Sequence, residues 1–192
     1  MRPLGASIFA DWVILMSLAD APANPVPAAR VIDLIVEPIT AEAFLPFGTL
    51  IEATEDGKLF GPDEAQLQLA RGTPRFYVMR LHGRPKSFTR ITRHLCVTQC
   101  LASVGGKPWL LAVAPPDHPD TPDAEPDPAS IRAFSIPGDV AVALHRSTWH
   151  AGPYFDAPEQ DFFNLELADT NQVDHHNCQL DRRFGLTFRF AP

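Results

Sequence analysis

The sequence predicts a single all-β domain, arranged as an antiparallel barrel or sandwich, and three observations support this. The chain has 192 residues, of which 45% are hydrophobic, which suits one sizeable core and is short for two full domains. From residue 75 onward, apolar runs of strand length are separated by glycine and proline, as is typical of short antiparallel strands. These interruptions leave little room for helices.

Seven apolar runs account for the expected strands. They span residues 76–81, 95–104, 109–114, 131–136, 140–144, 162–167 and 186–190. Gly105-Gly106 joins two neighbouring runs, and a Pro-Gly-Asp turn at residues 137–139 joins two others. Both connections are short enough for β-hairpins, so we expect hairpins at both places.

The N-terminal side of the domain is expected to carry a short helix or two. Residues 31–36 are rich in β-forming side chains, and Thr40 is well placed to cap a helix over residues 41–44. Pro46 and Gly48 then end that helix. Residues 63–70 could add one or two helical turns.

The domain is expected to cover residues 31–192, with residues 1–30 as an extension. An apolar run at residues 13–18 has the outline of a signal peptide, but it is short and Asp11 precedes it, so a loosely attached extension is favoured. No stretch approaches the ~20 apolar residues that cross a bilayer. Residues 115–130 hold six prolines and five acidic residues, which predicts an exposed loop that interrupts the barrel.

Composition favours small-molecule chemistry in a reducing compartment. The net charge of −7 and the pI near 5.4 argue against nucleic-acid binding, which needs basic side chains to neutralise phosphates. Cys96, Cys100 and Cys178 form no C-x-x-C pair, so neither a disulfide framework nor a zinc ribbon is indicated. We therefore expect a cytoplasmic protein.

The densest polar cluster of the sequence lies just beyond a predicted strand, at residues 144–153. It contains His145, Arg146, Trp149 and His150. Because side chains alternate along a strand, the two histidines would face opposite ways unless the chain bends at Ser147. Either histidine could instead only pack beside the tryptophan.

A second cluster, at residues 92–99, contains His94 and Gln99. These two have opposite strand parity, so a regular strand would need a bulge to bring them together. Two other stretches carry further polar residues. Asp161, Asn164 and Glu166 are expected to be solvated on a strand surface, and the run Asp174-His175-His176-Asn177 to be an exposed loop more readily than a metal site.

With these residues in view, an ordered series of motifs can be compared with known families. The series is Pro38-Ile39-Thr40, Glu42-Ala43-Phe44, Pro46-Phe47-Gly48, Ile51-Glu52, Gly72-Thr73, Arg75-Phe76, Arg93-His94, Thr98-Gln99, Arg132-Ala133-Phe134, His145-Arg146, Trp149-His150, Asp161-Phe162 and Asn177-Cys178. Taken in this order, it resembles the ureidoglycolate lyase (ureidoglycolate hydrolase) family over roughly residues 31–178. The resemblance implies a cupin barrel, a homodimer and a carbon–nitrogen lyase of allantoin breakdown, which splits ureidoglycolate into glyoxylate and urea.

The chain also departs from the family pattern near the expected site. Ala151 stands where the family often has a second histidine, Leu95 where it often has a proline, and Tyr77 where it often has a histidine. These departures bear on the choice of substrate.

The reaction needs an acid and a base, and histidine suits both because its ordinary pKa lies near neutral pH. We expect His94 and His150 to form this pair and Gln99 to bond the ureido group. The substrate carboxylate calls for an arginine, first Arg75 and second Arg146. Trp149 would exclude water from one side, and His145 completes the expected substrate-binding residues.

The same residues can be compared with the general cupin metal pattern. Thr92, His94, Gln99 and His150 would occupy its four positions, which leaves two imidazoles and a neutral amide. That is a poor ligand set, so the metal that the resemblance implies, nickel or another divalent ion, would be weakly held. Two other functions stay open: a non-catalytic cupin that binds a small organic acid, and a metal-dependent cupin oxygenase or isomerase.

Overall fold

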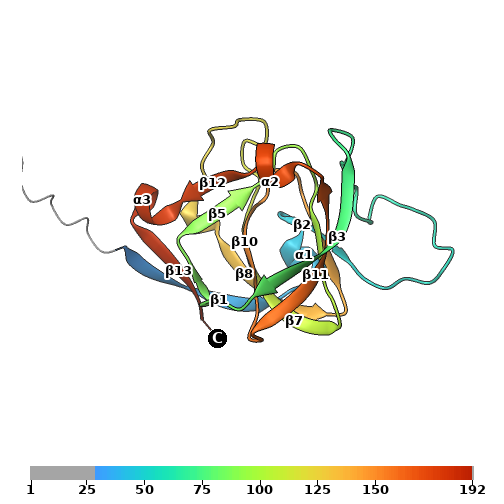
Figure 1. Cartoon of the computed structure of the whole chain (residues 1–192), viewed down its shortest axis with the longest axis horizontal. Coiled ribbons are helices and arrows are strands. Elements are labelled where there is room, and N and C mark those ends of the chain that lie inside the picture. Colours follow the sequence, from blue (N-terminus) through green and yellow to red (C-terminus); the bar gives the residue numbers. More distant parts are fainter. Residues whose placement is uncertain (1–28, 192) are drawn as a thin grey trace, which may run out of the picture.

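The computed structural model of the chain describes residues 29–191, which fold into two β-sheets around a shared interior (Figure 1). The larger sheet has the strand order β12 (His176–Gln179), β5 (Arg90–Arg93), β10 (Trp149–Tyr154), β7 (Gly106–Ala114), β8 (Arg132–Gly138), β1 (Arg30–Pro38), β13 (Leu186–Ala191) and β4 (Ser87–Phe88). The smaller sheet has the order β2 (Gly48–Ile51), β9 (Ala141–Leu144), β6 (Cys100–Ser103), β11 (Glu159–Leu167) and β3 (Pro74–His82). The predicted all-β, cupin-like barrel is confirmed.

Few helices accompany these strands. Helix α1 (Ala41–Phe44) begins where predicted, because the Thr40 hydroxyl accepts a hydrogen bond from the Ala43 N–H at 3.2 Å. The further helical turns expected over residues 63–70 are wrong, since that segment belongs to a long loop that projects from the barrel (Figure 1). Two short helices that were not predicted lie near the C-terminus instead: α2 (Thr170–Val173) and α3 (Leu180–Phe184).

The two predicted hairpins are also wrong. Strands β6 and β7 meet at Gly105-Gly106, yet β6 pairs with β9 and β11 while β7 pairs with β8 and β10. Likewise, β8 and β9 are consecutive in sequence and lie in different sheets. A tight turn can carry a chain from one layer to the other as readily as it can close a hairpin. Strand β1 departs from the antiparallel expectation too, because it runs parallel to both β13 and β8.

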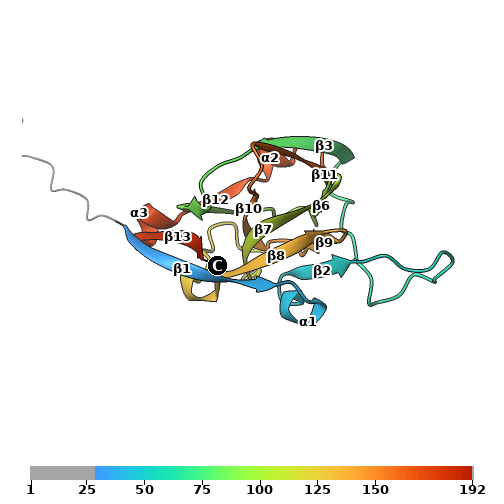
Figure 2. The same ribbon diagram turned by 90° about the horizontal axis from the view of Figure 1, so that it is seen from below.

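The core has two parts because the larger sheet is buried on both faces. Along β7, Leu111 and Val113 face the smaller sheet, whereas Ala112 and Ala114 face the other way, as strand alternation requires. The first pair packs in the barrel interior with Leu101 and Phe162 of the smaller sheet. The second pair packs with residues of β1, β4, β13 and α3, which curl over the outer face. In Figure 2, β1 lies along one side of the molecule and β3 along the opposite side.

The loop of residues 115–130 is mostly exposed, as predicted, and includes one 3-10 turn (Pro128–Ser130). It is nevertheless anchored, because the buried Arg93 guanidinium donates to the carbonyls of Thr121 at 2.5 Å and Pro122 at 3.2 Å. No helix within residues 29–191 is long and apolar enough to span a membrane. The expectations for residues 1–28 lie outside the described residues.

Candidate active site

Three histidines from separate segments meet at one end of the barrel interior. The ring centroid of His94, just after β5, lies 5.1 Å from that of His150 on β10 and 5.6 Å from that of His175. Strands β5 and β10 are neighbours, with His150 opposite Thr92. The structure therefore brings together His94 and His150, which are far apart in the sequence.

A bend at Ser147 separates the two histidines of the polar cluster at residues 144–153. Ser147 adopts a left-handed conformation with φ of 71°, and its N–H donates to the His94 carbonyl at 2.7 Å. His145, before the bend, is exposed and its Nε2 lies 3.1 Å from the Leu45 carbonyl. His150, after the bend, is 9% exposed and faces the interior. His145 therefore does not join the other histidines.

Backbone carbonyls determine the tautomers of the two interior histidines. His94 Nδ1 lies 2.6 Å from the Asp174 carbonyl, and His150 Nδ1 lies 3.2 Å from the Thr148 carbonyl. A carbonyl can only accept, so both Nδ1 atoms carry the hydrogen. In the neutral rings, each Nε2 is then left with a free lone pair.

Burial keeps these histidines neutral. Together with the neighbouring His94, burial lowers the pKa of His150 to about 3, and burial is the larger cause. Burial also lowers the pKa of His94, although hydrogen bonding to Asp174 and the charges of Asp174 and Glu166 oppose that shift. The pKa of His175 is lowered mainly by partial burial. At neutral pH the cluster can therefore accept a proton but holds none to give.

Asp174 holds His94 from two directions. While its backbone carbonyl binds the ring, its carboxylate accepts hydrogen bonds from the N–H groups of Leu95 at 2.7 Å and Cys96 at 2.8 Å. The side chain is buried, with 2% exposure. The expectation of an exposed loop at residues 174–177 is thus wrong for Asp174, because unpaired N–H groups after β5 require an acceptor.

Glu166 is a second buried carboxylate beside the cluster. It accepts hydrogen bonds from Gln99 Nε2 at 3.0 Å, from the Tyr77 hydroxyl at 3.1 Å and from Asn171 Nδ2 at 3.2 Å. The expected solvation of the polar side chains on this strand is therefore wrong for Glu166 and for Asn164, which are both buried. It is right for Asp161, which faces outward and forms a bidentate pair with Arg80.

The segment that carries His94 and Gln99 needs no bulge. Strand β5 ends at Arg93, and residues 94–99 cross as a loop to the smaller sheet, where β6 begins at Cys100. The apolar run at residues 95–104 is thus a strand only at its end. Leaving the strand frees both side chains from strict alternation.

A polar cavity of about 150 Å³ adjoins the histidines. Its walls include Thr92, His150 and His175 together with Arg84, Arg90 and Tyr154. The two arginines and the tyrosine continue into an adjoining hollow of about 430 Å³. Ala151, where the family often has a histidine, lines the smaller cavity.

Arg84 and Arg90 were missed by sequence reasoning. The Arg84 guanidinium lies 4.2 Å from the centre of the Tyr154 ring. Among residues 29–191, neither arginine forms an ion pair with a carboxylate. Their sequence neighbourhood has no distinctive spacing, so only the fold reveals that they share a cavity with His150.

The two arginines that the sequence favoured do not line this cavity. Arg75 is exposed on β3, with its guanidinium 3.8 Å from the centre of the Tyr77 ring. Arg146 donates to the Leu95 carbonyl at 3.0 Å and to Asp120 at 2.7 Å, which occupies its guanidinium. The two contacts of Arg146 join distant segments, which residue spacing does not encode.

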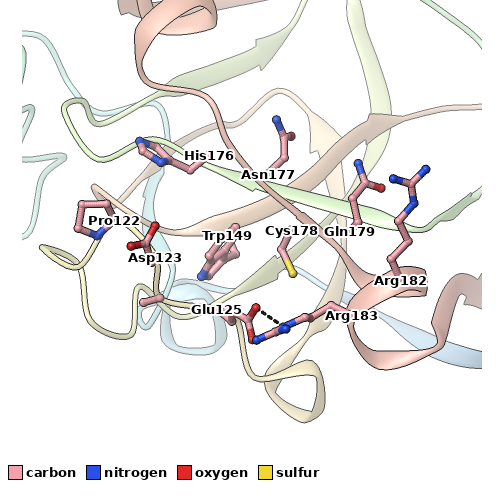
Figure 3. Close-up of a pocket in the computed structure, with 11 residues that line it drawn as sticks. Pro122, Asp123, Glu125, Trp149, His176, Asn177, Cys178, Gln179, Arg182 and Arg183 are labelled. Carbon is pink, nitrogen blue, oxygen red and sulfur yellow. Dashed lines mark ion pairs between the residues drawn. The ribbon is translucent and has the colours of Figure 1, made fainter.

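Trp149 lies on the other face of β10 from His150. It borders a separate hollow of about 650 Å³ between residues 122–125 and the segment from β12 to α3 (Figure 3). His176 and Cys178 also point to this hollow, and an ion pair between Glu125 and Arg183 closes one side (Figure 3). Although larger, this hollow does not contain His94 or His150. Trp149 therefore cannot shield the histidine cavity from water directly.

The donor set around the histidines does not fit a tightly bound metal ion. In the part of the chain that the structure describes, no three His, Cys, Asp or Glu side chains are arranged to hold one. Of the other positions in the cupin metal pattern, Thr92 donates to Asn177 at 2.7 Å and Gln99 donates to Glu166. Two imidazoles and one amide oxygen remain, which is a weak set.

Comparisons with known proteins agree with this architecture. A family model described as "Ureidoglycolate lyase" matches residues 31–184. The ureidoglycolate lyase of Pseudomonas syringae pv. syringae (strain B728a) is 30% identical over 157 residues, covering 74% of this chain and 88% of that protein. The ureidoglycolate lyase of Brucella anthropi is 34% identical over 148 residues, covering 70% of this chain and 83% of that protein, and that of Brucella ovis is 35% identical over the same length.

Proposed function

The chain belongs to the ureidoglycolate lyase family, and from that premise we propose that it splits ureidoglycolate into glyoxylate and urea. The observation that carries the proposal is the pair of buried histidines 5.1 Å apart, whose Nδ1 atoms are both bound to carbonyls. They lie beside a cavity with two arginines that have no carboxylate partner within residues 29–191. The family match spans every residue of that site.

The reaction moves one proton and breaks one bond. In ureidoglycolate a single carbon carries a hydroxyl, a carboxylate and the ureido nitrogen. When the hydroxyl loses its proton, a C=O bond forms, the C–N bond breaks and the nitrogen gains a proton. Glyoxylate and urea result, with no other reactant consumed.

His94 is the better base of the two histidines. The charges of Asp174 and Glu166 favour its protonated form, whereas no carboxylate does so for His150. We assign to His94 Nε2 the acceptance of the hydroxyl proton and its return to the departing nitrogen. His150 stays neutral, and its Nε2 can accept a hydrogen bond that orients the substrate. The substrate carboxylate, once bound, raises the pKa of both rings and so helps His94.

We assign the substrate carboxylate to Arg84 and Arg90. Both line the cavity and both lack a carboxylate partner among the described residues, which favours binding of an anion through paired guanidinium donors. This assignment replaces Arg75 and Arg146. Gln99 keeps the role of binding the ureido group.

The wider setting follows from the reaction class. We propose that the protein acts in allantoin breakdown, in the cytoplasm, as a homodimer. Its three cysteines are free thiols, as a reducing compartment allows. On the outer face of the smaller sheet, Phe76 and Phe163 stack at 5.6 Å and remain exposed, 68% and 39% respectively, which suits an interface with a second copy.

The proposal is tested by incubating the purified full chain with ureidoglycolate and measuring both products. Equal amounts of glyoxylate and urea, formed faster than in a heat-inactivated control, are expected. Binding without turnover would instead support a non-catalytic cupin. Oxygen consumption or an isomerised product would support the oxygenase or isomerase alternative.

A further inference from the structure

Glu166 is a buried carboxylate whose hydrogen bonds all come from neutral side chains. It is 1% exposed, and its donors are Tyr77, Gln99 and Asn171. Within residues 29–191 it forms no ion pair. Burying a carboxylate without a cation is unfavourable. Packing alone therefore does not explain Glu166.

The carboxylate dictates the orientation of the Gln99 amide. The Glu166 carboxyl oxygens accept all three of these hydrogen bonds, so the amide turns its NH₂ group toward Glu166 Oε2. The opposite orientation would set two acceptors against each other. Gln99 Oε1 thus points away from Glu166, and among the described residues this buried oxygen has no hydrogen-bond partner.

The orphaned oxygen belongs to the loop that also carries the proposed base. His94 and Gln99 are the two ends of the segment at residues 94–99. Burial lowers the pKa of His94 and of His175, and Glu166 is close enough to oppose part of that lowering in both. A buried acceptor without a donor is costly, so a ligand that supplies an N–H group there gains affinity. The ureido group has such N–H donors, whereas a simple 2-hydroxy acid has none.

We infer that Glu166 is a positioning residue, which holds Gln99 Oε1 as the acceptor that distinguishes ureido acids from other small hydroxy acids. The inference rests on the proposed function for the identity of the substrate. It adds that Glu166 decides which end of the Gln99 amide, the oxygen or the NH₂ group, faces the ligand. Replacing Glu166 by Gln removes that constraint, because the new amide can donate to Gln99 Oε1 and let the Gln99 side chain reverse.

The test compares two unreactive ligands on the full chain. Ureidoacetate is the substrate without its hydroxyl, and glycolate is the hydroxy acid without the ureido group. In Glu166→Gln the Kd for ureidoacetate, measured by titration, should rise about tenfold, as expected for one lost hydrogen bond at a buried acceptor. The Kd for glycolate should change less than twofold. Gln99→Met, which removes the acceptor and leaves Glu166, should give the same pattern.

Asp161→Asn is the matched control, because Asp161 is on the same strand and faces outward, paired with Arg80. It should change neither Kd. If Glu166→Gln weakened both ligands equally, or neither, the inference would be overturned. Retained preference for ureidoacetate in Gln99→Met would overturn it even if Glu166→Gln failed to fold. If the wild type cleaves ureidoglycolate and both variants keep the wild-type preference for ureidoacetate over glycolate, only this inference is overturned. If the wild type does not cleave ureidoglycolate, the proposed function is overturned.

Discussion

Single hydrogen bonds at Nδ1 decide what His94 and His150 can do. Each bond to a backbone carbonyl fixes the tautomer and leaves Nε2 as the only lone pair, so both rings are poised to accept. Burial lowers the pKa of both, so at neutral pH neither ring carries a second proton that it could give to the substrate. The proton that reaches the leaving nitrogen must then come from the substrate's own hydroxyl.

Replacing His94 by Asn tests this role. The Asn amide can still donate to the Asp174 carbonyl, as Nδ1 does, but it cannot exchange a proton near neutral pH. We expect kcat to fall about 10²–10⁴-fold while KM changes far less, since general acid–base catalysis acts on the transition state. Steady-state kinetics on folded protein measure this, with His118→Asn in the exposed loop as the control. Wild-type kcat in His94→Asn would remove His94 from the reaction.

Acid should destabilise the protein through His150. Its pKa is about 3 in the folded protein and near 6.5 when unfolded, so between these values only the unfolded chain binds the proton. The stability that this ring contributes is therefore complete above pH 6.5 and is lost as the pH falls toward 3, by up to about 1.4 kcal/mol per pH unit. Urea unfolding at several pH values should show a smaller slope for His150→Asn than for wild type or His118→Asn. An unchanged slope in His150→Asn would contradict the account.

Site residues could be predicted from the sequence only where they belong to a recognisable motif. His94, Gln99 and His150 stand in motifs that resemble the family, and the structure brings the two histidines together. Glu166 looked like an ordinary alternating strand residue, because its partners Tyr77 and Gln99 lie 89 and 67 positions away. Arg84 and Arg90 had no pattern at all.

The short helix α2 and the turn that follows it hold two parts of the site in place. Asn171 of α2 bonds Glu166, and Asp174 at the end of α2 holds the backbone after β5 as well as the His94 ring. This short segment therefore connects the smaller sheet to the larger one directly at the histidines.

Asp174→Asn should loosen that connection. The amide cannot accept from both backbone N–H groups, so one is left unpaired in a buried place, at a cost of about 1–3 kcal/mol. For a chain of this size the Tm should drop by about 2–4 °C per kcal/mol, and kcat should fall because His94 is less well held. Asp33→Asn, which breaks only the exposed surface pair with Arg189, should change the Tm far less than Asp174→Asn does, because solvent screens such pairs. Equal Tm values for the two variants would argue against the role of Asp174.

Strand positions were predictable from the sequence, but strand partners were not. Runs of apolar residues bounded by glycine and proline mark β7, β8, β9 and β11 closely. Which sheet each strand joins depends on burial in two separate core regions, and short turns such as Gly105-Gly106 are compatible with either choice. For the same reason, the sequence could not predict that β1 pairs with β13 in parallel.

At the scale of the whole molecule, the larger sheet separates two hollows that lie on opposite faces of β10. The inner one borders the buried His150 and opens toward the exposed Arg84 and Arg90, and the outer one, of about 650 Å³, contains Trp149. Volume alone would favour the outer hollow. The chemistry favours the inner one, because it holds the histidine acceptor and two arginines that form no ion pair with any residue the structure describes.

A crystal structure of the full chain with bound ureidoacetate tests this choice most directly. We expect the ligand in the histidine cavity, with its carboxylate against the guanidinium groups of Arg84 and Arg90 and its ureido N–H groups within hydrogen-bond reach of Gln99 Oε1. The His94 Nε2 atom should face the carbon that carries the hydroxyl in the substrate. Ureidoacetate bound in the Trp149 hollow, with the histidine cavity left without it, would contradict the central claim.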